Sequence, residues 1–409
     1  MSAQTQLLPL TRSSVEALSE RLNDPRWMRD FRLAAFDAYE ALPMPSTSDE
    51  EWRRTDIKGL DLSAFHPDPE AVSGPVTEAP ALPSGVVFTS IRKAAQEHPD
   101  LLREYFMRVC VRPEESKFRA LHGAFWTGGT FLYVPAGVEV SVPLASSTWI
   151  QSAGVALFPH TLIVAEPGSS VTLIDEFGSM AGGWSAFVDP VVELIVKDGA
   201  KVRYIAQQDW LAAITEIGIV RGRIARDATL HTLIVGFGGR IVKTNVESLL
   251  EGPGGHSEML GLVFGNDSQH FDFHTLQEHR APNTLSDLLY KNAVKDRART
   301  IFSGMIRVHH GAQKTNAFQA NRNLILSEGA KADSIPNLEI LANDLRCTHG
   351  SATSRLNEEH LFYLMSRGLR RVDAVRMVVE GFFAELFDRV PLEGVRLRLQ
   401  QDVDRKMVQ

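Results

Sequence analysis

The N-terminal part of the chain alternates amphipathic runs with proline breaks. Apolar residues recur at spacings of three and four across residues 12–42, a pattern typical of helices. The run ends at Leu42–Pro45, because proline cannot continue a helix. The segment Ile91–Met107 has the same periodicity, with a break at His98–Pro99. Residues 66–84 are rich in Pro, Gly and Ser and predict a linker or long loop.

From Gly123 onward, short apolar runs alternate with turns, a pattern typical of strands. One turn recurs with glycine at positions 137, 168 and 199, each 31 residues after the one before. Looser copies of this turn are centred on Asp227, Arg297 and Gly329. A turn at a fixed period without intervening helices predicts a β-solenoid, whose tight corners glycine permits. On the pattern alone, an ordinary β-sandwich with chance spacing remains the alternative.

Helical periodicity returns near the C-terminus. Asn357 is a suitable cap for a first helix and Gly368 a suitable terminator. A second helix is expected before Pro391, with a broad apolar stripe made of Val372, Val375, Val378, Val379, Phe382, Phe383, Leu386 and Phe387. Residues 394–409 could form a third helix. The stripe could pack against the first tail helix, or part of it could dock on a partner. Such a small unit has little core of its own, which favours some external contact.

The patterns therefore divide the chain into three expected domains within a mainly β fold. Residues 1–122 form an N-terminal helical domain with a linker, residues 123–346 a β-solenoid core and residues 347–409 a C-terminal helical domain. The chain carries 43 Lys and Arg against 50 Asp and Glu, mixed along its length, for a formal net charge of -7. This balance argues against binding to nucleic acid or to an anionic membrane.

Hydropathy and cysteine content narrow the class further. No apolar run approaches the roughly 20 residues needed to span a bilayer. The first residues lack a basic region followed by an apolar block, so we expect no secretion signal. The two cysteines, Cys110 and Cys347, exclude a disulfide framework and a four-cysteine metal site within one chain. The expectation is a reduced, cytoplasmic protein without contact to membrane or nucleic acid.

Candidate chemistry is limited to histidines and one thiol. Six of the 13 histidines lie between residues 256 and 310, and His270 and His274 would share a face in a strand or a helix. A metal site is conceivable there, but no HExxH or acid-rich ligand set accompanies them, so exposed or loop histidines are the simpler interpretation. Nucleotide and hydrolase motifs of the GxxxxGK[ST] and GxSxG types are absent.

Cys347 and His349 form the second candidate. Residues two apart in an extended segment project to the same side, so the thiol and the imidazole could hold one metal ion. Two ligands do not close a zinc or iron–sulfur site, so a partner chain would have to complete it. The alternative is a buried cysteine beside a hydrogen-bonded histidine.

Several motifs resemble the SufB/SufD family of the SUF iron–sulfur cluster assembly system, and more its SufD branch. In the N-terminal part they are Trp27-Met28, Phe31-Arg32, Leu42-Pro43 and Glu51–Thr55. In the C-terminal part they are Asn323–Ser327, Pro336–Ile340, Cys347–Gly350, Leu361–Leu364 and Ser366–Gly368. The resemblance covers nearly the whole chain.

The resemblance implies a right-handed parallel β-helix between helical N- and C-terminal domains. It also implies a non-enzymatic scaffold subunit of a SufBCD complex, with a role in iron supply and nascent cluster formation. The β-helix would pair with a SufB-like paralogue, and the C-terminal helices would bind a SufC-like ABC-type ATPase. No cofactor would be bound tightly by this chain alone, and iron or a nascent cluster would be held transiently in the complex. An isolated chain could form homodimers through the same β-helix edge.

The resemblance also assigns residues. His349, with Cys347, would be a metal ligand at the interface shared with the partner. The ATPase contact would comprise Leu361, Phe362, Tyr363, Arg367, Gly368, Phe382 and Phe383. Ala330 occupies the place of the sulfur-accepting cysteine of SufB-like chains, and Gly350 follows His349 as in SufD. We therefore expect no persulfide on this chain at that position.

Two other functions stay open on the sequence. A β-helix carbohydrate-active enzyme would need a pair of carboxylates, and no pair is marked in the sequence. A structural oligomerisation module would bind partners in the same way but would have no role for a metal. The two partner-binding hypotheses differ in whether replacing His349 has an effect.

Overall fold

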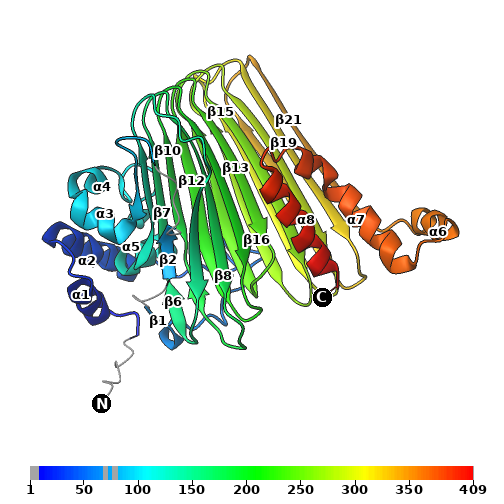
Figure 1. Cartoon of the computed structure of the whole chain (residues 1–409), viewed down its shortest axis with the longest axis horizontal. Coiled ribbons are helices and arrows are strands. Elements are labelled where there is room, and N and C mark those ends of the chain that lie inside the picture. Colours follow the sequence, from blue (N-terminus) through cyan, green and yellow to red (C-terminus); the bar gives the residue numbers. More distant parts are fainter. Residues whose placement is uncertain (1–8, 68–71, 76–81, 409) are drawn as a thin grey trace.

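The computed structural model describes residues 9–67, 72–75 and 82–408 (Figure 1). Its helices are α1 (Arg12–Arg21), α2 (Arg26–Ala41), α3 (Ile91–Glu97), α4 (Pro99–Tyr105), α5 (Lys117–Phe125), α6 (Glu358–Ser366), α7 (Arg371–Asp388) and α8 (Glu393–Val408). Short 3-10 turns are η1 (Glu50–Trp52), η2 (Leu62–Ala64) and η3 (Pro113–Glu115). The helices predicted from periodicity are all present, including the break at His98–Pro99, where α3 gives way to α4.

The strands follow in two groups along the chain. The first group is β1 (His66–Pro67), β2 (Val72–Pro75), β3 (Val87–Ser90), β4 (Gly128–Val134), β5 (Leu144–Ile150), β6 (Val155–Leu157), β7 (Pro159–Ala165), β8 (Ser170–Ser179), β9 (Phe187–Val188), β10 (Val191–Val196) and β11 (Lys201–Asp209). The second group is β12 (Thr215–Ile224), β13 (Thr229–Gly236), β14 (Ile241–Leu250), β15 (His256–Gly265), β16 (His270–His279), β17 (Leu285–Val294), β18 (Arg299–Val308), β19 (Thr315–Ile325), β20 (Lys331–Ile340) and β21 (Leu345–Arg355). Most strands of the second group have 10 or 11 residues, whereas the short strands β1, β6 and β9 have two or three.

These strands form two sheets, to which the chain contributes alternately. One sheet has the order β20-β18-β16-β14-β12-β10-β7-β4-β3 and the other the order β2-β5-β8-β11-β13-β15-β17-β19-β21. The pairs β3–β4 and β2–β5 are antiparallel, whereas the long strands from β10 to β21 pair in parallel. Each coil thus adds one strand to each sheet, which confirms the mainly β, parallel β-solenoid core between helical ends (Figure 1).

The turns along one edge explain the 31-residue spacing. Gly137, Gly168 and Gly199 have φ of 70°, 71° and 66°, a conformation that strains other side chains. The N–H groups of Gly137 and Gly168 bond to carbonyls of the following coil, so the turns stack. The same edge continues through positive-φ turns at Asp227, Gly254, Asn283 and Lys314.

Two of the predicted turn copies belong to the other edge. Arg297 lies where β17 passes to β18, and Gly329 lies where β19 passes to β20. Every coil has two turns, and an apolar residue followed by turn formers and a strand occurs at both of them. The sequence pattern alone therefore could not separate the edges.

Both predicted domain boundaries fall inside elements. The boundary at residue 122 lies within α5, and the boundary at residue 346 lies within β21. Part of the predicted linker at 66–84 forms strands, since β1 pairs with β6 and β2 with β5. The remainder of that linker, residues 68–71 and 76–81, lies outside the described residues.

A buried network joins the N-terminal helices to the first coils. The carboxylate of Glu193 accepts the backbone N–H groups of Met107 and Val111, both at 2.8 Å. Its Oε1 lies 3.3 Å from Nε2 of His160, whose Nδ1 lies 3.0 Å from Nε2 of His122. Burial raises the pKa of Glu193 to about 7 and lowers the pKa of His160 to about 3. Burial thus disfavours the charged forms of Glu193 and His160, and the hydrogen bonds from Met107 and Val111 hold the Glu193 carboxyl in place.

Replacing Glu193 with alanine is expected to lower the free energy of unfolding by about 3 kcal/mol, because two buried backbone N–H groups lose their acceptor. Equilibrium urea denaturation of the isolated chain measures the loss. The exposed Glu114 provides the control, and Glu114→Ala should change the stability by less than about 0.5 kcal/mol. Equal effects of the two substitutions would contradict a locking role for Glu193.

Candidate functional site

The two ends of the solenoid differ. At the first coil, β3 covers β4 and β2 covers β5, and the helices α2 and α5 belong to the apolar cluster beneath them. At the last coil, β20 is bonded to β18 and β21 to β19, and no other described strand pairs with either. These edges are 10 and 11 residues long. Long unpaired edges are templates for pairing with another chain.

Cys347 and His349 lie on the interior side of this last coil. In the parallel register, Cys347 neighbours Ala317 and His349 neighbours Gln319. Ala317 and Gln319 are each 1% exposed inside the solenoid, and residues in register point to the same side of a sheet. With no further coil above them, Cys347 is half-buried and His349 is exposed. Burial raises the pKa of the Cys347 thiol, which favours its neutral form.

Apolar interior positions are exposed on the same coil. Leu338 neighbours Ile306, and Ile340 neighbours Val308, and both neighbours are completely buried. Leu338 and Ile340 are themselves 39% and 41% exposed. The sequence indicated only that such residues belong to a core. Their exposure shows that the solenoid ends without the layer that would cover it.

The grouped histidines are held within the chain. His270 and His274 lie on one face of β16, as their spacing predicts. Nε2 of His270 is 2.9 Å from Oγ1 of Thr55, and Nε2 of His274 is 3.0 Å from Oδ1 of Asp272. The His270 ring therefore helps to fasten the segment after η1 to the sheet, whereas the His274 ring contacts a residue of its own strand.

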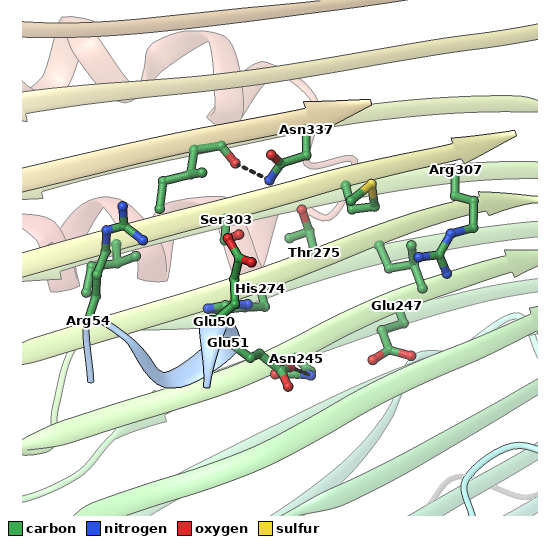
Figure 2. A pocket seen from close by; sticks show the side chains of 14 residues that line it. Glu50, Glu51, Arg54, Asn245, Glu247, His274, Thr275, Ser303, Arg307 and Asn337 are labelled. Carbon is green, nitrogen blue, oxygen red and sulfur yellow. Dashed lines mark hydrogen bonds between the residues drawn. The ribbon is translucent and has the colours of Figure 1, made fainter. Parts of the chain in front are cut away.

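A groove of about 550 Å³ lies on the outer face of this sheet and reaches β20 (Figure 2). Residues of η1 and Arg54 line one side, and side chains from β14, β16, β18 and β20 line the rest. Its charged residues are Glu50, Glu51, Glu247, Arg54 and Arg307, and His274 lies among them. Because acidic and basic side chains both line the groove, its charge does not indicate whether an anion or a cation would bind there. Across the described ranges, no three or more His, Cys, Asp or Glu side chains are grouped so as to hold a metal ion.

The helices α7 and α8 lie against the outer face of the other sheet (Figure 1). Phe383 is completely buried in this contact, whereas Phe382 is half-buried. Nζ of Lys291 on β17 donates to the carbonyl of Phe382 at 2.7 Å and lies 2.8 Å from Glu385. The solenoid therefore covers Phe383, whereas the half-buried Phe382 stays a predicted partner contact. The sequence showed the apolar stripe but not which surface covers it.

The helix α6 projects away from the solenoid (Figure 1). Asn357 caps it, and Gly368 follows it with φ of 94°, as predicted. Leu361 is completely buried and anchors the helix. Phe362 and Tyr363 are 73% and 57% exposed. Arg367 and Gly368 are also exposed. In the candidate contact motif, Leu361 therefore packs inside the protein, and the motif's other residues on α6 and at its C-terminus face solvent.

The sequence did not identify a second surface, between α7 and α8. A groove of about 650 Å³ separates these helices, and Met377 and Leu397 on its walls are 54% and 49% exposed. Met377 and Leu397 are apolar residues that do not belong to the apolar stripe. Their position outside the stripe was the sequence feature that could have indicated this second surface. No helix of the described residues is long and apolar enough to cross a membrane.

Comparison with known proteins adds a family. Residues 148–382 match a family model described as the SufBD core domain of SUF-system FeS cluster assembly, and residues 70–145 match the SufBD N-terminal region. The iron–sulfur cluster assembly protein SufD of Bacillus subtilis is 32% identical over 98% of both chains. SufB of the same organism is 28% identical over 94% of this chain and 90% of its own. A SufBD family protein of Staphylococcus epidermidis is 28% identical with the same coverage.

Proposed function

Because the chain belongs to the SufBD family of SUF-system iron–sulfur cluster assembly proteins, we propose that it is a SufD-like scaffold subunit without catalytic activity of its own. The observation that carries this proposal is the open end of the solenoid. It combines unpaired backbone, exposed apolar interior positions and two side chains able to ligate iron. We place the complex in the cytoplasm, where the free cysteines Cys110 and Cys347 stay reduced.

The partner at the open end is a SufB-like paralogue. A chain that is 28% identical over 94% of this one would end in a comparable coil. Pairing the two edges would satisfy backbone groups that otherwise bond only to water and would bury Leu338 and Ile340. A second copy of this chain offers the same edge, so a homodimer is the competing product in the absence of the paralogue.

Iron or a nascent cluster is the cargo of this interface. Cys347 and His349 supply a thiol and an imidazole from one chain, and the partner supplies the remaining ligands. Ala330 occupies the family's sulfur-accepting position and is 4% exposed in the turn before β20. Sulfur therefore reaches the interface through the partner rather than through this chain.

The energy source is a SufC-like ATPase that docks on α6. The exposed aromatic surface of this helix suits a groove on another protein. The helices α7 and α8 are fastened to the solenoid by buried apolar contacts and by Lys291. A movement of the ATPase would therefore act on the solenoid through helices that cannot slide freely.

Phe362→Glu is expected to weaken binding of the SufC-like ATPase about 100-fold, because a large apolar contact is replaced by a charge. At 73% exposure, Phe362 contributes little to the fold, so the midpoint of unfolding should not change. Co-purification with both partners, followed by the ATPase rate of the complex, measures the effect. Deleting residues 357–409 is a poorer test, because it would uncover the apolar face beneath α7 and α8.

Val408→Glu is the matched control for this experiment. Val408 is an 87% exposed apolar residue on α8 rather than α6, and its replacement should leave ATPase binding intact. The Phe362→Glu chain should still pair with the SufB-like partner through the open end. If the unmodified chain assembles with neither partner, the scaffold proposal is wrong.

A further inference from the structure

The interior of the last coils contains buried polar atoms with no hydrogen-bond partner. Within the described part of the chain they include atoms of Thr275, Gln277, Tyr290, Asn292, Gln319 and Ser334. Leaving a buried donor or acceptor without a partner costs about 1–3 kcal/mol, and native interiors contain few such groups. Comparable atoms occur near the covered end as well, but those beside the open end lie within reach of a group that a partner brings.

Gln319 is the most unusual member of this cluster. Its side chain is 1% exposed, and neither Oε1 nor Nε2 has a partner. The amide lies against Gly304, where an added Cβ would come within 2.4 Å of Nε2. The absence of a side chain at residue 304 thus provides the space for the amide. The next coil places His349 beside Gln319 and Pro336 beside Gly304.

A histidine that ligates a metal needs a partner for its other ring nitrogen. That second hydrogen bond fixes the tautomer and the orientation of the ring. In the isolated chain, water can supply it, because His349 is exposed. When a partner covers the open end, water is displaced and the ring needs a fixed group. Gln319 is the neighbour in register, and its amide offers both a donor and an acceptor.

We propose that Gln319 is the positioning residue for His349, and that on assembly its amide bonds to the imidazole nitrogen that does not face iron. The inference rests on the proposed function and adds a residue to the same site. It explains why an amide without a partner is kept in the interior. The group destabilises the isolated chain and acts only in the assembled one.

The test compares the isolated chain with the complex of this chain, the SufB-like partner and the SufC-like ATPase. Gln319→Leu should leave the unfolding midpoint of the isolated chain unchanged or raised, because it removes two unpartnered polar atoms. In the complex, ferrous iron should bind about 10- to 100-fold more weakly by equilibrium dialysis. The Mössbauer spectrum of the bound iron should change as well. Gln319→Glu keeps an acceptor oxygen and should restore much of the binding.

A second variant leaves Gln319 in place. Gly304→Ala forces the amide to move, because its Cβ would lie 2.4 Å from Nε2. It should lower iron binding in the complex in the same direction as Gln319→Leu. Complex assembly, followed by size-exclusion chromatography, should be normal for all three variants, since none of the altered side chains lies on the exposed rim.

The outcomes separate this inference from its premise. If Gln319→Leu lowers the stability of the isolated chain and leaves iron binding unchanged, an enclosed water already satisfies the amide and the inference is wrong. Unchanged iron binding together with unchanged stability also overturns it. If His349→Ala abolishes iron binding while Gln319→Leu does not, the site stands and only the role of Gln319 fails. If His349→Ala itself has no effect, the premise fails.

Discussion

Lysine at both Leu338 and Ile340 is expected to weaken pairing with the SufB-like partner by about 100-fold. Each substitution removes about 1 kcal/mol of apolar burial and adds an ammonium group that the interface would have to desolvate. Both side chains face the interior from a coil that nothing covers, at 39% and 41% exposure. Charged residues on edge strands are a common means of preventing association of sheets. Titration calorimetry with the purified partner measures the change.

Val142→Lys is the control for that result. Val142 is 49% exposed in the loop between β4 and β5, at the covered end of the solenoid, so its replacement should leave pairing intact. Thermal unfolding of the isolated double variant should stay near that of the unmodified chain, because the two side chains already contact water. Unchanged affinity of the double variant would place the paralogue elsewhere on the molecule.

The open end could be predicted only in part from the sequence. Alternation in β20 and β21 identifies strands, and the fixed spacing of Gly137, Gly168 and Gly199 identifies a solenoid, because a positive φ is a strict local demand. Which coil comes last is not a local property. Leu338 has the same pattern around it as its neighbour Ile306, although Ile306 is completely buried. Leu338 is exposed because the chain after β21 forms helices instead of a further coil that would cover it.

The helices show the same limit. Periodicity predicted α7 over 18 residues, and it missed α5 because that helix has only nine residues, too short a run to establish the helical period. For Phe383, periodicity identified an apolar stripe but could not distinguish the protein's own sheet from a partner. The structure resolves this, because the outer face of β17 and β19 is apolar and Lys291 bonds to the backbone of α7. Among the described C-terminal helices, α6 contributes no residue to the apolar cluster on this sheet.

His349→Ala is expected to leave the fold and the pairing intact and to lower the yield of clusters on the assembled complex at least about 10-fold. The imidazole is exposed in the isolated chain, so removing it takes little from the free energy of unfolding. At the interface it is one of two ligands that this chain can offer, and the thiol of Cys347 alone would leave the iron site short of a donor. The visible absorption of reconstituted complexes measures the yield.

His310→Ala provides a matched control, since His310 is an exposed histidine in the turn after β18, outside the interior side of the last coil. Its complexes should form clusters as the unmodified ones do. Cys347→Ala then decides the role of the thiol: a ligand would show a loss comparable to that of His349→Ala, whereas a packing residue would show only a small change in stability, because it is half-buried beside Ala317. Normal cluster yield from His349→Ala would leave a solenoid that pairs with its paralogue but takes no part in holding iron. The exposed edge would then be sufficient to explain the architecture, and the chain would be an oligomerisation module.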